Sequence, residues 1–247
     1  MKRLITRTTA IRHGIALGLT VLVVCGCTST PPAQRHGAPA EREFSMADLA
    51  KSDIDQVAEI HLDHSMASLR LVMEKLYRRN PRELHKNANA TIETAIGRAF
   101  DPATKWTFAE FDSRRGVEVL HLAFRSDYAG DRVFAFIVGL GGMIHQAYNE
   151  QQAFYLLDQL DPQNLYNAAR NVEIAAWKLS NARGTHGELL LLSNESAATV
   201  HNLSFEREFG KLIAYQDILA RVLAQRTNRT LRFVVQNAAS AVFLPIY

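Results

Sequence analysis

The chain has 247 residues, which is long enough for one domain with a sizeable core. Four of its 28 Lys and Arg residues lie in the first 26 residues, which contain no acid, and the rest of the chain has 24 basic against 25 acidic residues. Its charge therefore gives no reason to expect nucleic-acid binding. The only cysteines, Cys25 and Cys27, lie near the N-terminus, so the body of the chain excludes disulfides, thiol catalysis, cysteine-zinc sites and iron–sulfur clusters.

The N-terminus has the pattern of an export signal. An apolar run covers residues 15–24, and only Thr20 interrupts it. It is preceded by four basic residues, Lys2, Arg3, Arg7 and Arg12. A permanent membrane-spanning helix needs about 20 apolar residues, so this run fits a cleaved signal better than a membrane span.

The run ends in Val24-Cys25-Gly26-Cys27, with a small residue directly before a cysteine. Over residues 1–28 this pattern resembles the signal of bacterial lipoproteins. The resemblance implies cleavage before Cys27, a diacylglyceryl group on its sulfur and a third acyl chain on its amine, which together would hold the protein on a membrane. In this class an Asp after the cysteine retains the protein at the inner membrane, and Thr28 stands there instead. The resemblance thus implies an outer-membrane lipoprotein facing the periplasm.

Three parts follow from this pattern. Residues 1–26 are the expected signal peptide, and residues 27–43 hold the acylated cysteine and a tether. Because the tether is rich in Pro and Ala and lacks large apolar side chains, we expect it to be disordered and to span roughly 20 to 25 Å. Residues 44–247 form a single periplasmic domain.

The first half of this domain predicts two long helices. Ser52 and Asp55 fit a capping box, and the first helix should end at Asn80. Its apolar stripe consists of Ala58, Leu62, Met66, Leu69, Met73 and Leu76. Pro81 should begin a second helix, which continues to Ala99 and forms an antiparallel hairpin with the first.

The second half predicts two further long helices. Asp161-Pro162 is a helix start, and Gly184 is a plausible stop. A last helix should run from Ser204 to Arg226. Residues 117–124 and 231–235 are β-branched and aromatic enough for short strands, and the sequence leaves helix or strand open there. The expected fold class is mainly α: a single multi-helix domain with at most one or two short strands.

A glycine-containing apolar segment covers residues 133–144 without a charge. Its glycines weaken a helix, so they need a reason. We favour a central core helix that its neighbours approach closely, and the alternatives are an apolar pocket wall for an acyl chain or a segment that dips into the membrane. The candidate residues are Phe134, Phe136, Gly139, Gly141, Gly142 and Met143.

Two polar groups invite binding hypotheses. His61 and His64 are spaced by three residues on one helix, as two metal ligands would be, but no partner motif accompanies them and we favour a solvated helix face. No cofactor is predicted. A basic cluster at the end of the first helix could bind an anionic surface or an acidic protein, although Glu74 and Glu83 partly offset its charge. It consists of Arg78, Arg79, Arg82, His85 and Lys86.

Enzyme signatures are absent from the sequence, which contains no nucleophile elbow, phosphate-binding loop or zinc-protease motif. Glu110 and Asp112, beside three aromatic residues, are the carboxylate pair that most resembles a sugar site, but aromatic packing at a core edge explains them more simply. The sequence therefore favours a non-enzymatic envelope adaptor or assembly factor with a protein partner. The alternatives are a lipid or apolar-ligand binding protein and, third, an envelope enzyme.

Overall fold

The computed structural model describes residues 52–247 apart from 88–89, 156–159, 198–199 and 234–240. The expected signal peptide, Cys27 and the tether lie outside the described residues. Helices dominate the part of the chain that is described, so the mainly α prediction is confirmed. The helices are α1 (Asp53–Arg79), α2 (Pro81–Leu84), α3 (Ile92–Ala99), α4 (Val117–Ala123), α5 (Arg132–Ala147), α6 (Pro162–Asn181) and α7 (Ser204–Arg226).

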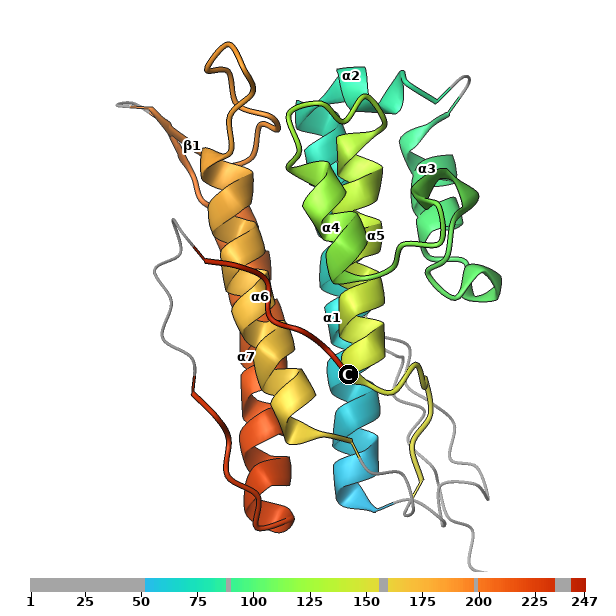
Figure 1. Ribbon diagram of the computed structural model, residues 1–247, viewed down its shortest axis with the longest axis vertical. Coiled ribbons are helices and arrows are strands. Elements are labelled where there is room, and N and C mark those ends of the chain that lie inside the picture. Colours follow the sequence, from blue (N-terminus) through green and yellow to red (C-terminus); the bar gives the residue numbers. More distant parts are fainter. Residues whose placement is uncertain (1–51, 88–89, 156–159, 198–199, 234–240) are drawn as a thin grey trace, which may run out of the picture. The chain divides into compact units, whose positions relative to one another are not determined.

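Four long helices form the centre of the domain (Figure 1). α1 packs on α5 and α7, and α6 packs on the same two helices, which closes a four-helix bundle. The end of α1 meets the start of α5, because the Tyr77 hydroxyl donates a hydrogen bond to Asp131 at 2.7 Å. α1 and α7 are antiparallel, since Lys75 bonds to the carbonyl of Ser204 and His61 lies against Tyr215. Neighbouring helices therefore alternate in direction, as short connections favour.

The long helices begin where their capping residues predict. The Ser52 N–H donates to the Asp55 carboxylate at 2.8 Å ahead of α1, and the Gln163 N–H donates to the Asp161 side chain at 2.8 Å ahead of α6. Each carboxylate accepts a hydrogen bond at a helix start, where backbone N–H groups have no intrahelical partner and the helix dipole favours an anion. α7 has the predicted bounds.

The predicted second long helix is wrong. α2 has only four residues, and α3 begins after Thr91, whose side chain accepts the Thr94 N–H at 3.2 Å. Tertiary contacts end α2 early, because Glu83 accepts the Arg132 N–H at 2.7 Å and Asn87 donates to Asp131 at 2.9 Å. Glu83 inside α2 and Asn87 just beyond it thus bind the start of α5, and the hairpin of two long helices does not form.

The two segments left open between helix and strand have different outcomes. Residues 117–123 are helical as α4, which Gly116 precedes with a φ of 49° that favours glycine. Residues 231–233 are neither helix nor strand, and 234–235 lie outside the described residues. The described strands, β1 (Glu195–Ala197) and β2 (Val200–Asn202), form an antiparallel hairpin that the sequence did not indicate.

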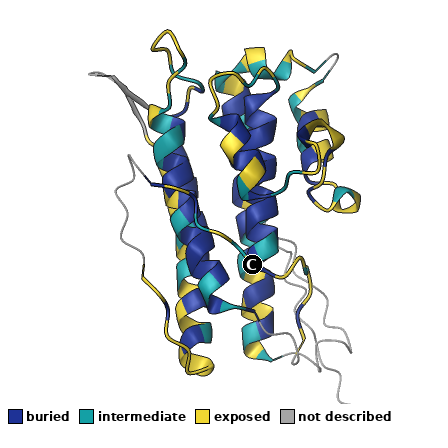
Figure 2. Ribbon diagram, viewed as in Figure 1, coloured by how far each residue is buried: buried dark blue, intermediate teal, exposed yellow. Residues whose placement is uncertain are grey.

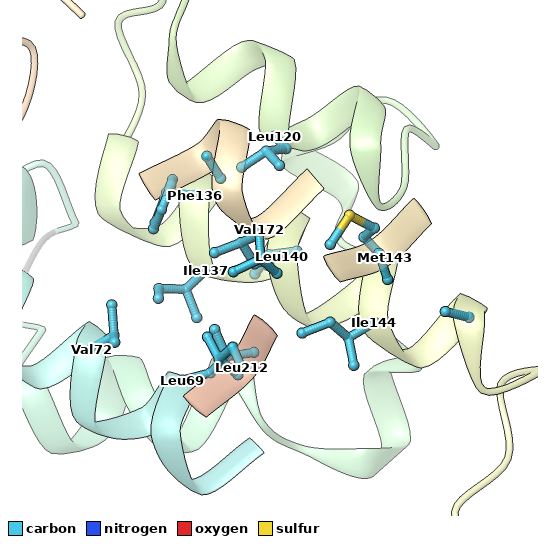
Figure 3. Close-up of a cluster of buried hydrophobic side chains, with 14 of the residues drawn as sticks. Leu69, Val72, Leu120, Phe136, Ile137, Leu140, Met143, Ile144, Val172 and Leu212 are labelled. Atoms are coloured by element: carbon cyan, nitrogen blue, oxygen red, sulfur yellow. The ribbon is translucent and has the colours of Figure 1, made fainter. Parts of the chain in front are cut away.

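α5 is the central helix of the core. Every one of its residues except Gln146 is buried, and Figure 2 shows burial concentrated on the inner faces of the bundle. In Figure 3 side chains from α1, α4, α5, α6 and α7 meet around it. Among the described residues, no helix combines the length and the hydropathy that crossing a membrane requires.

Candidate binding sites

The glycines of α5 are explained by close packing. A Cβ atom at Gly139 would lie 2.6 Å from the Leu120 backbone nitrogen, so α4 touches the α5 backbone there. At Gly141 a Cβ would overlap the Trp106 ring, and Gly142 also faces this residue. The glycines thus allow one helix and one indole to reach α5 directly, which is the close approach that the sequence favoured.

The larger side chains of the same segment fill the core. Phe134 packs against Phe108 with ring centroids 5.0 Å apart, and Phe136 packs against Phe209 at 6.3 Å. Met143 is fully buried. Among the described residues, these side chains thus pack against their neighbours around this part of α5.

A cavity of about 260 Å³ lies beside the end of α5, and we call it the Trp106 pocket. It is bordered by α1, by the segment that follows α3 and by His145 of α5. None of the six candidate residues of the glycine segment lines it. The lining residues are Leu62, Asp63, Met66, Arg70, Phe100, Asp101, Pro102, Lys105, Trp106, His145 and Gln152.

The inner wall of this pocket carries a buried imidazole. His145 is 7% exposed, and neither ring nitrogen has a hydrogen-bond partner among the described residues. Burial lowers its pKa, the Glu150 charge raises it and the Arg115 charge lowers it further. His145 is therefore neutral at pH 7 and offers one donor and one acceptor.

The outer part of the pocket carries cations and aromatic rings. The Arg70 guanidinium carbon lies 4.3 Å from the centre of the Phe100 ring, and Phe100 meets Trp106 edge to face at 5.3 Å. Lys105 and Trp106 both have left-handed backbone conformations, with φ of 48° and 58°. Such conformations cost energy and are maintained by surrounding contacts, here the packing of the indole on α5.

The candidate metal pair lies at the contact between α1 and α7. His61 and His64 both pack against the Tyr215 ring, at centroid distances of 5.4 and 5.7 Å, and His61 Nδ1 lies 3.1 Å from the Tyr215 carbonyl oxygen. Burial lowers the pKa of His61, although that hydrogen bond raises it. In the described part of the chain no three metal-ligating side chains come together. These histidines thus join two helices.

The basic cluster lies at the end of the bundle away from residue 52, here called the distal end. Arg78 pairs with Glu74 at 2.7 Å, and Lys86 pairs with Glu83 at 2.8 Å. Arg82 is exposed and has no carboxylate partner among the described residues. The structure thus places the acids beside the cluster, as the sequence suggested, and leaves part of its charge available.

The aromatic and acidic segment after α3 packs at a core edge. Phe111 is fully buried, and Glu110 forms an ion pair with Arg98. The Arg98 guanidinium in turn lies 4.4 Å from the Phe134 ring centre. Because Glu110 already has a cationic partner, this geometry favours packing over a pair of catalytic carboxylates.

Sequence reasoning missed a row of buried asparagines on α6 that binds the C-terminal residues. Asn171 accepts the Leu244 N–H at 2.6 Å and donates to the Leu244 carbonyl at 2.8 Å. Asn164 makes the same pair of bonds with Tyr247, and Asn167 donates to the Pro245 carbonyl at 2.9 Å. The signal was available, because polar side chains at residues 164, 167 and 171 recur at helical spacing beside the apolar stripe.

Asp131 is a buried carboxylate at the start of α5. It accepts hydrogen bonds from Tyr77 at 2.7 Å, Asn87 at 2.9 Å and the Phe134 N–H at 2.9 Å. Burial nevertheless raises its pKa to about 6, with the Glu83 charge adding to the rise and the hydrogen bonds opposing it. Asp131 therefore binds a proton more tightly in the folded chain than in the unfolded chain.

The raised pKa of Asp131 predicts that the free energy of unfolding depends on pH. The stabilisation by protonated Asp131 is complete below its unfolded pKa of about 3.9 and is lost as the pH rises through about 6. Between pH 4 and 7 the free energy of unfolding of the Asp131→Asn variant should gain about 2 kcal/mol relative to the natural chain. Urea unfolding of both chains across this range measures the difference, and a constant difference would refute the assignment.

Comparison with known proteins identified no relative: no protein-family model, no curated protein and no solved structure matches the chain.

Proposed function

We propose that this chain is an acylated envelope lipoprotein whose helical domain acts as an adaptor for a protein partner. The observation that carries the proposal is the close packing around α5, which is buried on nearly every residue. A domain with a packed interior and external charged surfaces is better suited to hold a partner than to enclose an acyl chain. The lipid-binding alternative loses support for the same reason.

The position of the basic cluster favours the distal end as the binding surface. α1 has 27 residues, so its two ends are about 40 Å apart. The proposed anchor at Cys27 and its tether join the domain at the N-terminal end of α1. Arg78, Arg79, Arg82 and Lys86 lie at the other end of this helix, at a surface that an acidic envelope protein can reach.

In-cell photo-crosslinking tests this proposal. A crosslinking residue at position 82 should capture one recurrent envelope protein, whereas the same residue at Gln225, which is exposed at the opposite end of the bundle, should not. Reversing Arg78, Arg79 and Arg82 to Glu should reduce the yield at least about tenfold, because several charges of the surface change sign. Mass spectrometry identifies what is captured.

Two outcomes would contradict the adaptor proposal: equal yields from both positions, or an undiminished yield after charge reversal. Lipid retained without any protein would favour the apolar-ligand alternative. The anchor is tested separately by palmitate labelling, with Cys27→Ala as the control because it lacks the sulfur. If the natural chain incorporates no palmitate, the predicted acylation of Cys27 is wrong, independently of the crosslinking result.

A further inference from the structure

We propose that the Trp106 pocket binds a small organic anion. This site is separate from the distal basic cluster, because it lies between α1, the segment after α3 and the end of α5. Its occupant would be held by charge at the mouth, by aromatic rings along the walls and by a hydrogen bond to His145.

The cations at the mouth call for an anion. Arg70 and Lys105 are exposed, and neither has a carboxylate partner among the residues that the structure describes. Because Arg70 stacks on Phe100, its planar guanidinium is held in place, and its edge can donate two parallel bonds to a carboxylate or phosphate.

The acids that line the pocket are already engaged. The Asp101 carboxylate accepts the Ala103 N–H at 2.9 Å, where it begins a short 3-10 helix, and Asp63 also has an interaction partner. Both carboxylates keep their negative charge, so the two acids and the two cations of the lining balance. An anion is therefore selected by the side-chain donors of Arg70 and Lys105, which these acids do not occupy.

The inner wall of the pocket can bind a second polar group of the ligand. His145 is buried at the pocket, and neither ring nitrogen has a partner in the part of the chain that the structure describes. A buried polar atom without a partner is costly. A ligand with a hydroxyl, carbonyl or carboxylate oxygen at its far end would pair with the neutral imidazole. Phe100 and Trp106 supply the apolar walls between the two ends.

Packing against α5 holds the aromatic wall of the pocket rigidly. Trp106 is 9% exposed and rests on Gly141 and Gly142, so the two glycines of α5 fix the position of a pocket residue. The adjacent Lys105 takes its left-handed conformation in the same turn. Rigid walls reduce the entropy that the protein loses when a ligand binds. A cavity of about 260 Å³ is smaller than most drug-binding pockets and suits a ligand of about ten non-hydrogen atoms.

Fluorine NMR of the full chain in detergent micelles tests the proposal with three probes of matched size. 4-Fluorobenzoate and 4-fluorophenyl phosphate carry the anion, and 4-fluorobenzamide is the neutral control. We expect saturable binding of at least one anion and at least about tenfold weaker binding of the amide. Arg70→Gln should weaken anion binding by about tenfold or more, because a charge-assisted hydrogen bond is lost.

Arg125→Gln is the matched control, since it removes an exposed arginine that pairs with Asp127 and does not line the pocket. It should leave binding unchanged and also corrects for partition of the probes into detergent. Circular dichroism verifies the fold of each variant, and Lys105→Gln replaces Arg70→Gln if that chain unfolds. The proposal is overturned if neither anion binds saturably up to about 10 mM. Equal binding of the amide, or unchanged binding by the pocket variant, would overturn it as well.

Discussion

Gly139→Ala is expected to destabilise the domain by about 3 kcal/mol. The added Cβ would lie 2.6 Å from the backbone nitrogen and 2.7 Å from the Cα of Leu120. These are backbone atoms, so α4 as a whole must move away from α5, and overpacking of this kind costs about 1 to 3 kcal/mol or more. The higher helix propensity of alanine recovers at most about 1 kcal/mol. Urea unfolding followed by circular dichroism measures the change.

Gly210→Ala provides the matched control. Gly210 is exposed in the middle of α7, and a Cβ there would have nothing within 4 Å. The same substitution should therefore stabilise the domain by about 0.5 to 1 kcal/mol through helix propensity alone. Opposite signs at the two glycines are the diagnostic result, and a stabilised Gly139→Ala chain would show that α4 does not pack as described.

Asn171→Ala is expected to lower the free energy of unfolding by about 2 to 3 kcal/mol. Asn171 is fully buried, and its amide satisfies both the N–H and the carbonyl of Leu244. Alanine removes two hydrogen bonds and leaves two partly buried backbone groups without partners, which costs about 1 to 3 kcal/mol. The nearby Phe243 ring, which is buried against His121, would lose its position as well.

Hydrogen exchange separates local from global loss in this variant. The amides of Leu244 and Tyr247 should exchange much faster in Asn171→Ala even where α6 remains folded. Asn181→Ala is the control, because Asn181 is exposed at the end of the same helix and should change stability by less than about 0.5 kcal/mol. Unchanged protection of Leu244 would mean that the asparagine row does not hold the C-terminal residues.

The glycines of α5 illustrate how far sequence reasoning reached. Their presence in an apolar helix required a close approach, and that much follows from helix propensity alone. Which groups approach was open, because Leu120 and Trp106 come from segments that precede α5 and that could equally have packed elsewhere. The structure assigns Gly139 to one helix and Gly141 to an indole. Only the second contact contributes to a pocket.

Sequence by itself determined the features that local interactions control. Helix starts at Ser52 and Asp161 depend on a side chain and a backbone N–H only a few residues apart, so a linear pattern contains all the information. The apolar periodicity of α1, α6 and α7 likewise selects a helix and its buried face. The export signal and Cys27 are also read from the linear pattern, and that prediction remains to be tested by acylation.

Tertiary structure alone decided the features that distant residues create. α2 ends early because Glu83 and Asn87 bind the start of α5, a contact that overrides an apolar stripe continuing beyond Pro81. Residues 117–123 become helix because α4 packs on the glycine face of α5, although their β-branched composition also fits a strand. The Trp106 pocket, too, joins residues of three segments, because burial and packing act through space rather than along the chain.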